Sequence, residues 1–149
     1  MSSGTASAGT TVQVLAGPGE SVDVPAQLEL VAPLPGLAGH TRYVLDPLDE
    51  GGVLFALRSL PADEHDAPIR LFVVSPSAHF PDYAPTIDAD DLAWDAVAES
   101  TVVLVVVHPG RDDDAPTANL LAPIVVDTRT GSAVQVVLDG DWPVRAPVG

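Results

Sequence analysis

The stretch TANLLAPIVVDTRTGSAVQVVLDG, residues 117–140, contains two apolar runs on either side of a short polar segment. Both runs are rich in valine or isoleucine, residues that favour strands. Between them, residues 127–131 end in a glycine, which can take the positive φ that a tight turn requires. The stretch therefore predicts a β-hairpin.

Pro123 lies inside the first apolar run, although proline has no N–H to donate to a neighbouring strand. Within sheets, proline is confined to edges, strand starts and bulges. We therefore expect Pro123 where the strand leaves its neighbour. Asn119 is expected to close the preceding turn through hydrogen bonds between its side chain and the backbone. Direct contact of Asn119 with a partner is the alternative interpretation.

Further segments have the composition of strands. Residues 22–30 alternate between apolar and polar side chains, which is typical of a half-buried strand with Pro25 at an edge or bulge. Four short runs rich in β-branched residues are bounded by Gly, Pro or Asp, at residues 42–45, 53–57, 69–74 and 101–107. Together with the hairpin, these segments predict a mainly β fold.

One segment has a helical pattern instead. Asp88 stands at an expected N-cap, and Asp90 and Asp91 follow in the first turn, which favours a short helix over residues 89–98. A calcium loop is the competing interpretation, but the glycine and the later glutamate of such a loop are missing. The neighbouring carboxylates of residues 112–114 repel one another and are expected to form a solvated loop.

Residues 1–21 are rich in Ser, Gly, Thr and Ala, which predicts a disordered or weakly ordered extension with at most one short strand around Val14. The domain is then expected to cover residues 22–149. The start of the chain lacks the basic and apolar regions of a secretory signal. The longest apolar run, residues 102–107, is far shorter than the roughly 20 residues that span a bilayer. We expect a cytoplasmic protein with no membrane contact.

The charge balance limits the possible partners. The 149 residues include 21 Asp and Glu against six arginines and no lysine, giving a formal net charge of -15. This charge argues against direct binding to nucleic acid or anionic lipid and favours a basic partner. Cysteine is absent, which excludes disulfides, thiolate zinc sites and cysteine nucleophiles.

Motifs for catalysis are weak. The histidines show no metal-ligand spacing, no G-x-S-x-G is present, and the lack of lysine excludes a Schiff base or a P-loop. We therefore expect no catalytic residue, no cofactor and no metal site. The four histidines are His40, His65, His79 and His108.

Several loop motifs occur in a fixed order along the chain. LPGLAG stands at residues 34–39, PLDE at 47–50, FPDY at 80–83, TANLLAPIVV at 117–126 and QVVLD at 135–139. FPDY alone is not specific, but TANLLAPIVV followed by QVVLD is. Over residues 28–146, this combination resembles the family of the flagellar assembly factor FliW.

The resemblance implies a small, mostly antiparallel β-barrel-like single domain with one short helix, and it implies that the protein is not an enzyme. Members of this family bind newly made flagellin in the cytoplasm. After flagellin has been exported, they bind and antagonise CsrA, an RNA-binding repressor of flagellin translation. The expected partners are therefore flagellin and CsrA, without direct nucleic-acid contact, and the protein is expected to be a monomer. An acidic surface suits a basic RNA-binding partner, because opposite potentials accelerate association.

The chain departs from the family pattern in three places. Leu37 and Ala38 replace an aromatic and an acidic residue after the Pro-Gly turn, and residues 77–79 replace an aromatic run ahead of FPDY. The chain ends in WPVRAPVG instead of a basic-His-Pro sequence. Any partner contact made there is expected to be remodelled.

The FPDY turn is the first candidate for partner contact. Phe80 and Tyr83 flank a Pro-Asp turn and could form an exposed aromatic anchor of the kind enriched at interface hot spots. The alternative is that Phe80 plugs the end of the barrel. The complete set of predicted partner-binding residues is Phe80, Asp82, Tyr83, Asp112, Asp113, Asp114 and Asn119.

A second functional hypothesis stays open at this point. A small β-barrel could also be a ligand-binding protein or an enzyme of cupin type. That function would require histidines and carboxylates that converge inside the mouth of the barrel.

Overall fold

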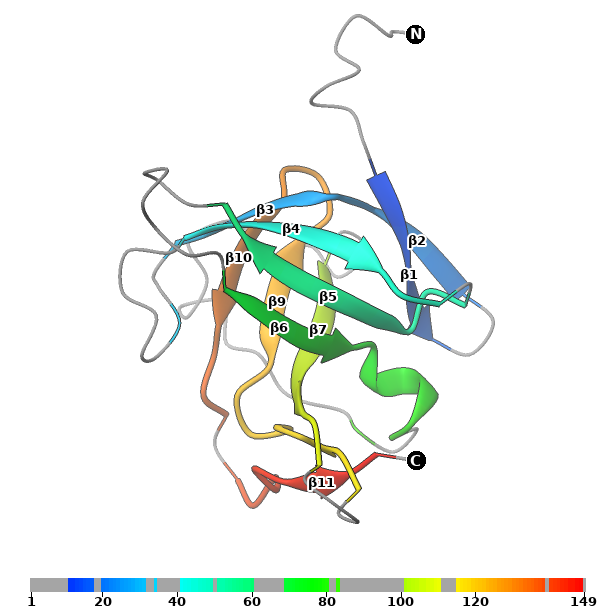
Figure 1. Cartoon of the computed structure of the whole chain (residues 1–149), viewed down its shortest axis with the longest axis vertical. Helices are drawn as coiled ribbons and strands as arrows, with labels where there is room; N and C mark the ends of the chain where they lie inside the picture. The colour runs from blue at the N-terminus through cyan, green and yellow to red at the C-terminus, as the bar shows by residue number, and fades with distance from the viewer. Residues whose placement is uncertain are drawn as a thin grey trace, which may run out of the picture.

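The computed structural model describes residues 11–17, 20–31, 34, 41–49, 51–60, 69–80, 83, 101–110, 115–138 and 140–148. Within these ranges the chain is almost entirely strand and loop (Figure 1). The elements are β1 (Thr11–Gly17), β2 (Glu20–Pro25), β3 (Gln27–Leu30), β4 (Arg42–Pro47), β5 (Leu54–Ser59), β6 (Arg70–Val74), η2 (Pro76–Ala78, a 3-10 helix), β7 (Thr101–His108), β8 (Thr117–Ala118), β9 (Ile124–Asp127), β10 (Ser132–Gln135) and β11 (Ala146–Pro147).

Seven of these strands close into a barrel. The order is β7-β6-β5-β4-β3-β10-β9, and β9 pairs back with β7 through residues 101–104. Each pair is antiparallel except β3 and β10, which run parallel. Closure gives each of the seven barrel strands two neighbours, so the barrel itself has no exposed sheet edge. The prediction of a mainly β, barrel-like fold is confirmed.

The predicted hairpin is formed by β9 and β10, in which Val126 is opposite Ala133 and Ile124 is opposite Gln135. The turn ends at Gly131, whose φ is 84°. A Cβ at this position would lie only 2.6 Å from the carbonyl oxygen of Gln27, so glycine is required by both φ and space.

Asp127 holds the start of this turn. Its carboxylate is buried, and Oδ1 accepts hydrogen bonds from the backbone N–H of Arg129 at 2.9 Å and from its Nε at 3.0 Å. The hydrogen bond from the Arg129 side chain lowers the pKa of Asp127 against the opposing effect of burial. Thr130 and Gly131 donate their N–H groups to the backbone carbonyl of Asp127.

Asn119 and Pro123 take the structural positions that their residue types favour. Oδ1 of Asn119 accepts hydrogen bonds from the backbone N–H groups of Leu121 at 3.1 Å and Ala122 at 3.2 Å, which closes the turn before Pro123. Pro123 lies directly before β9, and its carbonyl accepts a hydrogen bond from the N–H of Val136. The predicted hydrogen bonding of Asn119 is confirmed.

The single strand predicted over residues 22–30 is in fact two strands. β2 and β3 are separated at Ala26, where the chain leaves its pairing with β1 and joins the barrel beside β4. The predicted alternation persists through the break, because Val24, Ala26, Leu28 and Leu30 are all buried. The other four expected strands correspond to β4, β5, β6 and β7.

The amino-terminal part of the chain carries more structure than its composition indicates. β1 is a seven-residue strand that forms a hairpin with β2, and the side chain of Val14 is fully buried. This hairpin crosses the domain boundary predicted at residue 22, and the position of that boundary stays a prediction. The predicted helix at residues 89–98 lies outside the described residues, as do residues 1–10.

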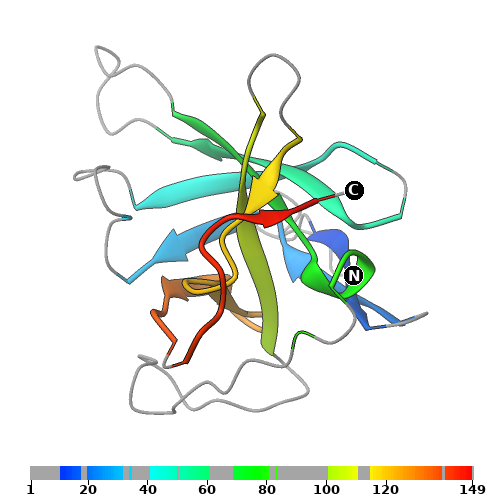
Figure 2. The same cartoon turned by 90° about the horizontal axis from the view of Figure 1, so that it is seen from below.

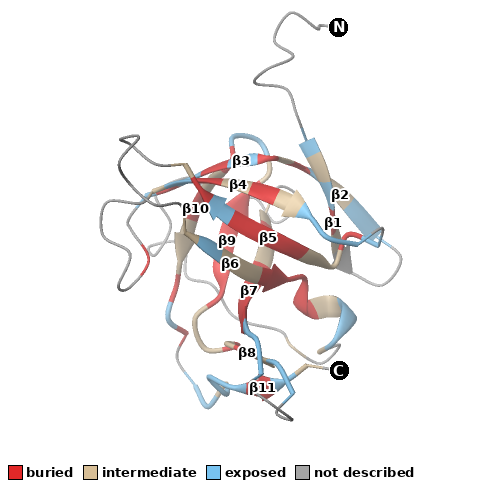
Figure 3. Cartoon of the chain, in the orientation of Figure 1, coloured by how far each residue is buried: buried red, intermediate tan, exposed pale blue. Residues whose placement is uncertain are grey.

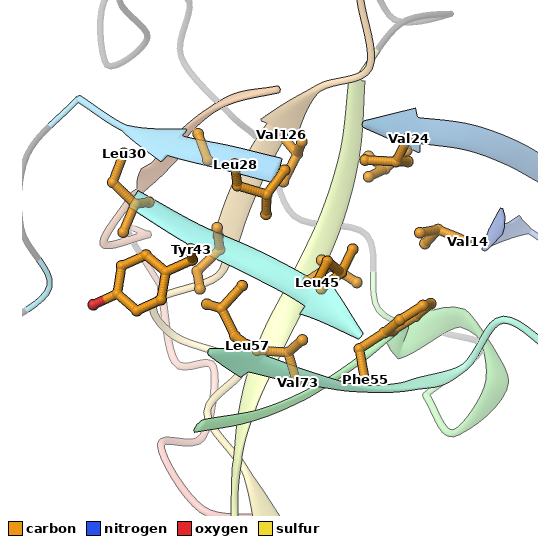
Figure 4. Close-up of a cluster of buried hydrophobic side chains, with 14 of the residues drawn as sticks. Val14, Val24, Leu28, Leu30, Tyr43, Leu45, Phe55, Leu57, Val73 and Val126 are labelled. Carbon is orange, nitrogen blue, oxygen red and sulfur yellow. The ribbon is translucent and has the colours of Figure 1, made fainter. Parts of the chain in front are cut away.

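The barrel interior is filled by side chains that point inward from every strand, together with Val14 and Val24 of the β1–β2 hairpin (Figures 3 and 4). Burial raises the pKa of the Tyr43 phenol, whose hydroxyl has no hydrogen-bond partner among the described residues. The core residues are Val14, Val24, Leu28, Leu30, Leu34, Tyr43, Leu45, Phe55, Leu57, Val73, Val102, Leu104, Val106, Ile124, Val126 and Ala133.

Candidate partner-binding surface

Strands β6 and β7 are apolar on both faces. Along β6, Leu71 and Val73 pack into the barrel core, whereas Phe72 and Val74 belong to a second hydrophobic cluster on the outside. β7 divides in the same way, with alternate side chains in the core and in the outer cluster. Such uninterrupted apolar sequences are typical of strands that are buried on both faces. Something must therefore cover the outer face of these strands.

The carboxy-terminal part of the chain covers a portion of this outer face. β8 pairs with the end of β7, and β11 pairs with β8, so that Ala118 and Ala146 lie in the outer cluster. Figure 2 shows β11 alongside β8, with η2 on the same side of the molecule as the carboxy-terminus. Trp142 adds its ring to the same cluster.

The two aromatic residues of the FPDY motif, Phe80 and Tyr83, pack against this cover. The ring of Tyr83 meets Trp142 edge to face, with centroids 4.7 Å apart and planes at 86°. The Tyr83 hydroxyl donates a hydrogen bond of 2.6 Å to the carbonyl oxygen of Leu120, and burial raises the pKa of Tyr83 to about 12. Phe80 is half-buried in the outer cluster. Both aromatic rings therefore have packing roles within the chain.

Part of the outer face stays open as a groove of about 650 Å³. The groove lies between η2, the beginning of β5, the end of β7 and the carboxy-terminal segment. Its lining is almost wholly apolar, and among the described residues that line it, Asp49 and His79 are the ones with ionisable side chains. The residues that line it are Asp49, Val53, Leu54, Phe72, Val74, Ala78, His79, Val107, Pro109, Pro116 and Val148.

The β4–β5 turn fixes one wall of the groove. Oδ1 of Asp49 accepts hydrogen bonds from the backbone N–H groups of Val53 at 3.1 Å and Leu54 at 3.3 Å. Gly52, directly before Val53, has a φ of 73°, and its carbonyl accepts a hydrogen bond from the N–H of Leu15. This turn corresponds to the PLDE motif and the glycines that follow it.

A second, polar hollow lies on the opposite side of the β7–β8–β11 sheet. His108 and Thr117 line it, whereas their neighbours Val107 and Pro116 line the apolar groove. Successive residues of a strand point to opposite faces, so the two hollows lie on opposite faces of this sheet, and Pro109 at the end of β7 lines both. The second hollow also contains Arg145, an exposed cation in a strongly acidic chain.

The cupin-type hypothesis requires polar residues inside the barrel. The barrel interior is instead filled with aliphatic and aromatic side chains. Across the part of the chain that the structure describes, no three His, Asp or Glu side chains form a group able to hold a metal ion. In the same part, no helix has the length and apolarity that a membrane crossing requires.

The structure brings three of the predicted partner-binding residues to the same outer cover. Phe80 and Tyr83 are members of the outer cluster. Asn119 directly precedes Leu120, another member of that cluster, and its backbone N–H donates a hydrogen bond to the carbonyl of Val106 on β7. Asp82 and residues 112–114 lie outside the described residues. The sequence analysis did not predict the groove, although Asp49 of the PLDE motif lines it. The uninterrupted apolar runs of β6 and β7 are the signal from which a covered outer face could have been inferred.

Comparison with known proteins gives a consistent result. The family model described as FliW protein matches residues 18–148. The chain is 33% identical over 119 residues to the flagellar assembly factor FliW of Bacillus licheniformis, covering 78% of this chain and 80% of the relative. The FliW of Bacillus subtilis is 31% identical over 120 residues, again covering 78% and 80%. A crystal structure of the flagellar assembly factor FliW superposes with a TM-score of 0.68, covering 91% of this chain and 96% of that one at 18% identity, and so has the same fold.

Proposed function

Because the chain belongs to the FliW family of flagellar assembly factors, we propose that it binds unassembled flagellin in the cytoplasm and, when flagellin is scarce, binds and antagonises the translational regulator CsrA. It acts through binding rather than catalysis. The observation that best supports this function is the apolar groove on the outer face of β6 and β7.

The groove suits a subunit that has not yet been assembled. Permanent interfaces between subunits are more hydrophobic than ordinary protein surface, so a subunit exposes apolar side chains until it is incorporated. The volume of the groove lies within the usual range of ligand pockets and leaves room for a few apolar side chains of a partner. Phe72, Leu54 and Val148 are half-buried there and would become fully covered in the complex.

The charge of the molecule supports the second partner. A protein that binds RNA neutralises phosphates with lysine and arginine, so CsrA must carry a basic surface. The formal net charge of -15 attracts such a surface and repels RNA itself. The protein therefore antagonises CsrA by contacting the regulator and makes no contact with the message.

Two valines of the carboxy-terminal segment provide a matched test of flagellin binding. Val148 lines the groove, whereas Val144 is 48% exposed and does not. We expect wild-type protein to bind the cognate flagellin with micromolar or tighter affinity in calorimetry. Val148→Asp should weaken this binding at least tenfold, because the carboxylate would lose its hydration inside an apolar groove. Val144→Asp should bind as tightly as wild type.

The possible outcomes distinguish whether the protein binds flagellin from whether it does so in the groove. If wild-type protein fails to bind flagellin, the proposed function is wrong. If wild type binds and the two aspartate variants bind equally well with unchanged melting temperatures, the function stands and the groove is not the flagellin site.

A further inference from the structure

The two strands of the β1–β2 hairpin differ in what lies along their outer edges. On β1, the N–H of Leu15 donates to the carbonyl of Gly52 at 2.8 Å, and the carbonyl of Leu15 accepts from the Ser75 hydroxyl. The carbonyl of Gln13 also faces this turn, because a Cβ on Gly52 would lie 2.8 Å from it. The outer edge of β1 is therefore covered by the β4–β5 turn.

The register determines which backbone groups of β2 point outward. Leu15 is opposite Ser21, and Gln13 is opposite Asp23. In an antiparallel ladder, two residues that stand opposite each other either exchange both hydrogen bonds or point their N–H and C=O groups away from each other. The backbone N–H and C=O groups of Leu15 point away from β2, so those of Ser21 point away from β1. The same holds for Gln13 and Asp23, which lie two residues further along the ladder.

No backbone hydrogen bond among the described residues uses these outward groups of Ser21 and Asp23. Pro25 occupies the next outward position, opposite Thr11, so its missing N–H leaves the ladder with β1 intact. Within the described part of the chain, the edge of β2 is thus unpaired along residues 20–23, in contrast to that of β1.

The side chains on this edge select a particular kind of partner. Glu20, Ser21 and Asp23 are exposed, and the pale blue of β2 in Figure 3 shows how far the strand faces solvent. A second copy of the chain is disfavoured, because self-pairing would bring two sets of carboxylates together. A segment that carries lysine or arginine would meet opposite charge instead.

We propose that the open edge of β2 binds CsrA by adding an extended, basic segment of that protein as a further strand. In this mode of recognition, main-chain hydrogen bonds provide affinity and side chains provide specificity. Ser21 and Asp23 supply the donors and acceptors, and Glu20 and Asp23 supply the charge. This inference rests on the proposed antagonism of CsrA and assigns it a surface separate from the apolar groove.

Asp23→Pro tests the main-chain part of this contact. The substitution removes an outward N–H and places a ring on the open edge, while the inward hydrogen bonds of Val22 and Val24 to β1 remain. We expect at least a tenfold loss of affinity for CsrA in surface plasmon resonance, with flagellin binding unchanged. CsrA binding at wild-type strength by this variant would overturn the proposal.

Charge reversal provides a second test that does not alter the backbone. Glu20→Lys with Asp23→Lys should lower the association rate with CsrA at least tenfold, because both side chains are exposed and act mainly by attraction. Asp141→Lys, at another exposed carboxylate, is the control and should have a much smaller effect. An unchanged association rate in the double variant would contradict the proposal even if Asp23→Pro failed to fold.

The remaining outcomes are also decisive. If wild-type protein does not bind CsrA, both this inference and the CsrA part of the proposed function are wrong, while flagellin binding is tested independently. If both variants lose CsrA binding and retain flagellin binding, the open edge is the site of CsrA contact.

Discussion

The inner and outer faces of β6 and β7 are built from the same kinds of side chain but are covered to different extents. Inside the barrel, Val73 and Leu104 are almost fully buried by strands on every side. Outside, Val105 is fully buried beneath the outer cover, whereas Phe72 remains half-buried in the groove. The inner face is closed by the barrel itself, and the outer face is left for short carboxy-terminal strands to cover in part. The inner face therefore belongs to the core of the fold, and the proposed flagellin binding uses the outer face of the same strands.

Substitutions in two adjacent residues of β5 should give the largest difference between the faces. Phe55 is fully buried in the core, while its neighbour Leu54 points into the groove. Phe55→Ala should lower the free energy of unfolding by about 3–5 kcal/mol, because it leaves a cavity that the closed barrel cannot fill. Leu54→Ala should cost less than half as much. Urea unfolding measures both, and equal losses would contradict the division between the faces.

The turn that forms the groove wall should show a smaller effect. Gly52→Ala forces a residue with a Cβ into a φ of 73° and places that Cβ 2.8 Å from the Gln13 carbonyl oxygen. We expect a loss of about 1–3 kcal/mol in the free energy of unfolding. Gly51→Ala is the control, because a Cβ there would lie at an ordinary contact distance of 3.8 Å from the side chains of Asp49 and Val53. Similar melting temperatures for the two variants would show that the turn adapts without strain.

A substitution of Tyr83, which packs in the outer cover, should have the smallest effect on the free energy of unfolding. Tyr83→Phe removes the hydrogen bond to Leu120 but keeps the ring against Trp142, so we expect a loss of about 0.5–1.5 kcal/mol. Because the folded protein raises the pKa of Tyr83 to about 12, the unfolded chain ionises first as the pH rises.

The stability contributed by this phenol is therefore complete below about pH 10, the ordinary pKa of tyrosine, and is lost as the pH rises toward 12. Unfolding measured across that range should depend less steeply on pH in Tyr83→Phe than in wild type. Parallel curves for the two proteins would mean that the hydroxyl is not held in the outer cover.

Much of the barrel follows from local sequence signals. The β-branched runs at residues 42–45, 53–57, 69–74 and 101–107 predict strands, and Gly131 predicts the hairpin turn. Closure does not follow from such signals, because it depends on the parallel pairing of β3 with β10 far along the chain. β1 was underestimated for a similar reason, since Val14 becomes buried only when β1 pairs with β2 and packs against the barrel core.

The candidate site was less predictable than the fold. Phe80 and Tyr83 stood out as possible contacts because they flank a turn, but the Tyr83 hydroxyl bonds to a carbonyl 37 residues away. No local pattern reveals such a partner. The groove combines Leu54, Phe72 and Val148, which meet only when β5, β6 and the carboxy-terminal segment are brought together. Apolar residues at successive positions of β6 and β7 were the one signal that the outer face would need a cover.

The central claim, that the open part of the outer face receives flagellin, is tested most directly by methyl NMR spectroscopy of the protein with and without its cognate flagellin. We predict that the largest changes in chemical shift occur at the methyl groups of Leu54, Val107 and Val148, which line the groove. The methyl groups of Leu57 and Val126, inside the barrel, should shift little. Large shifts confined to residues away from the groove, with its lining unchanged, would contradict the claim.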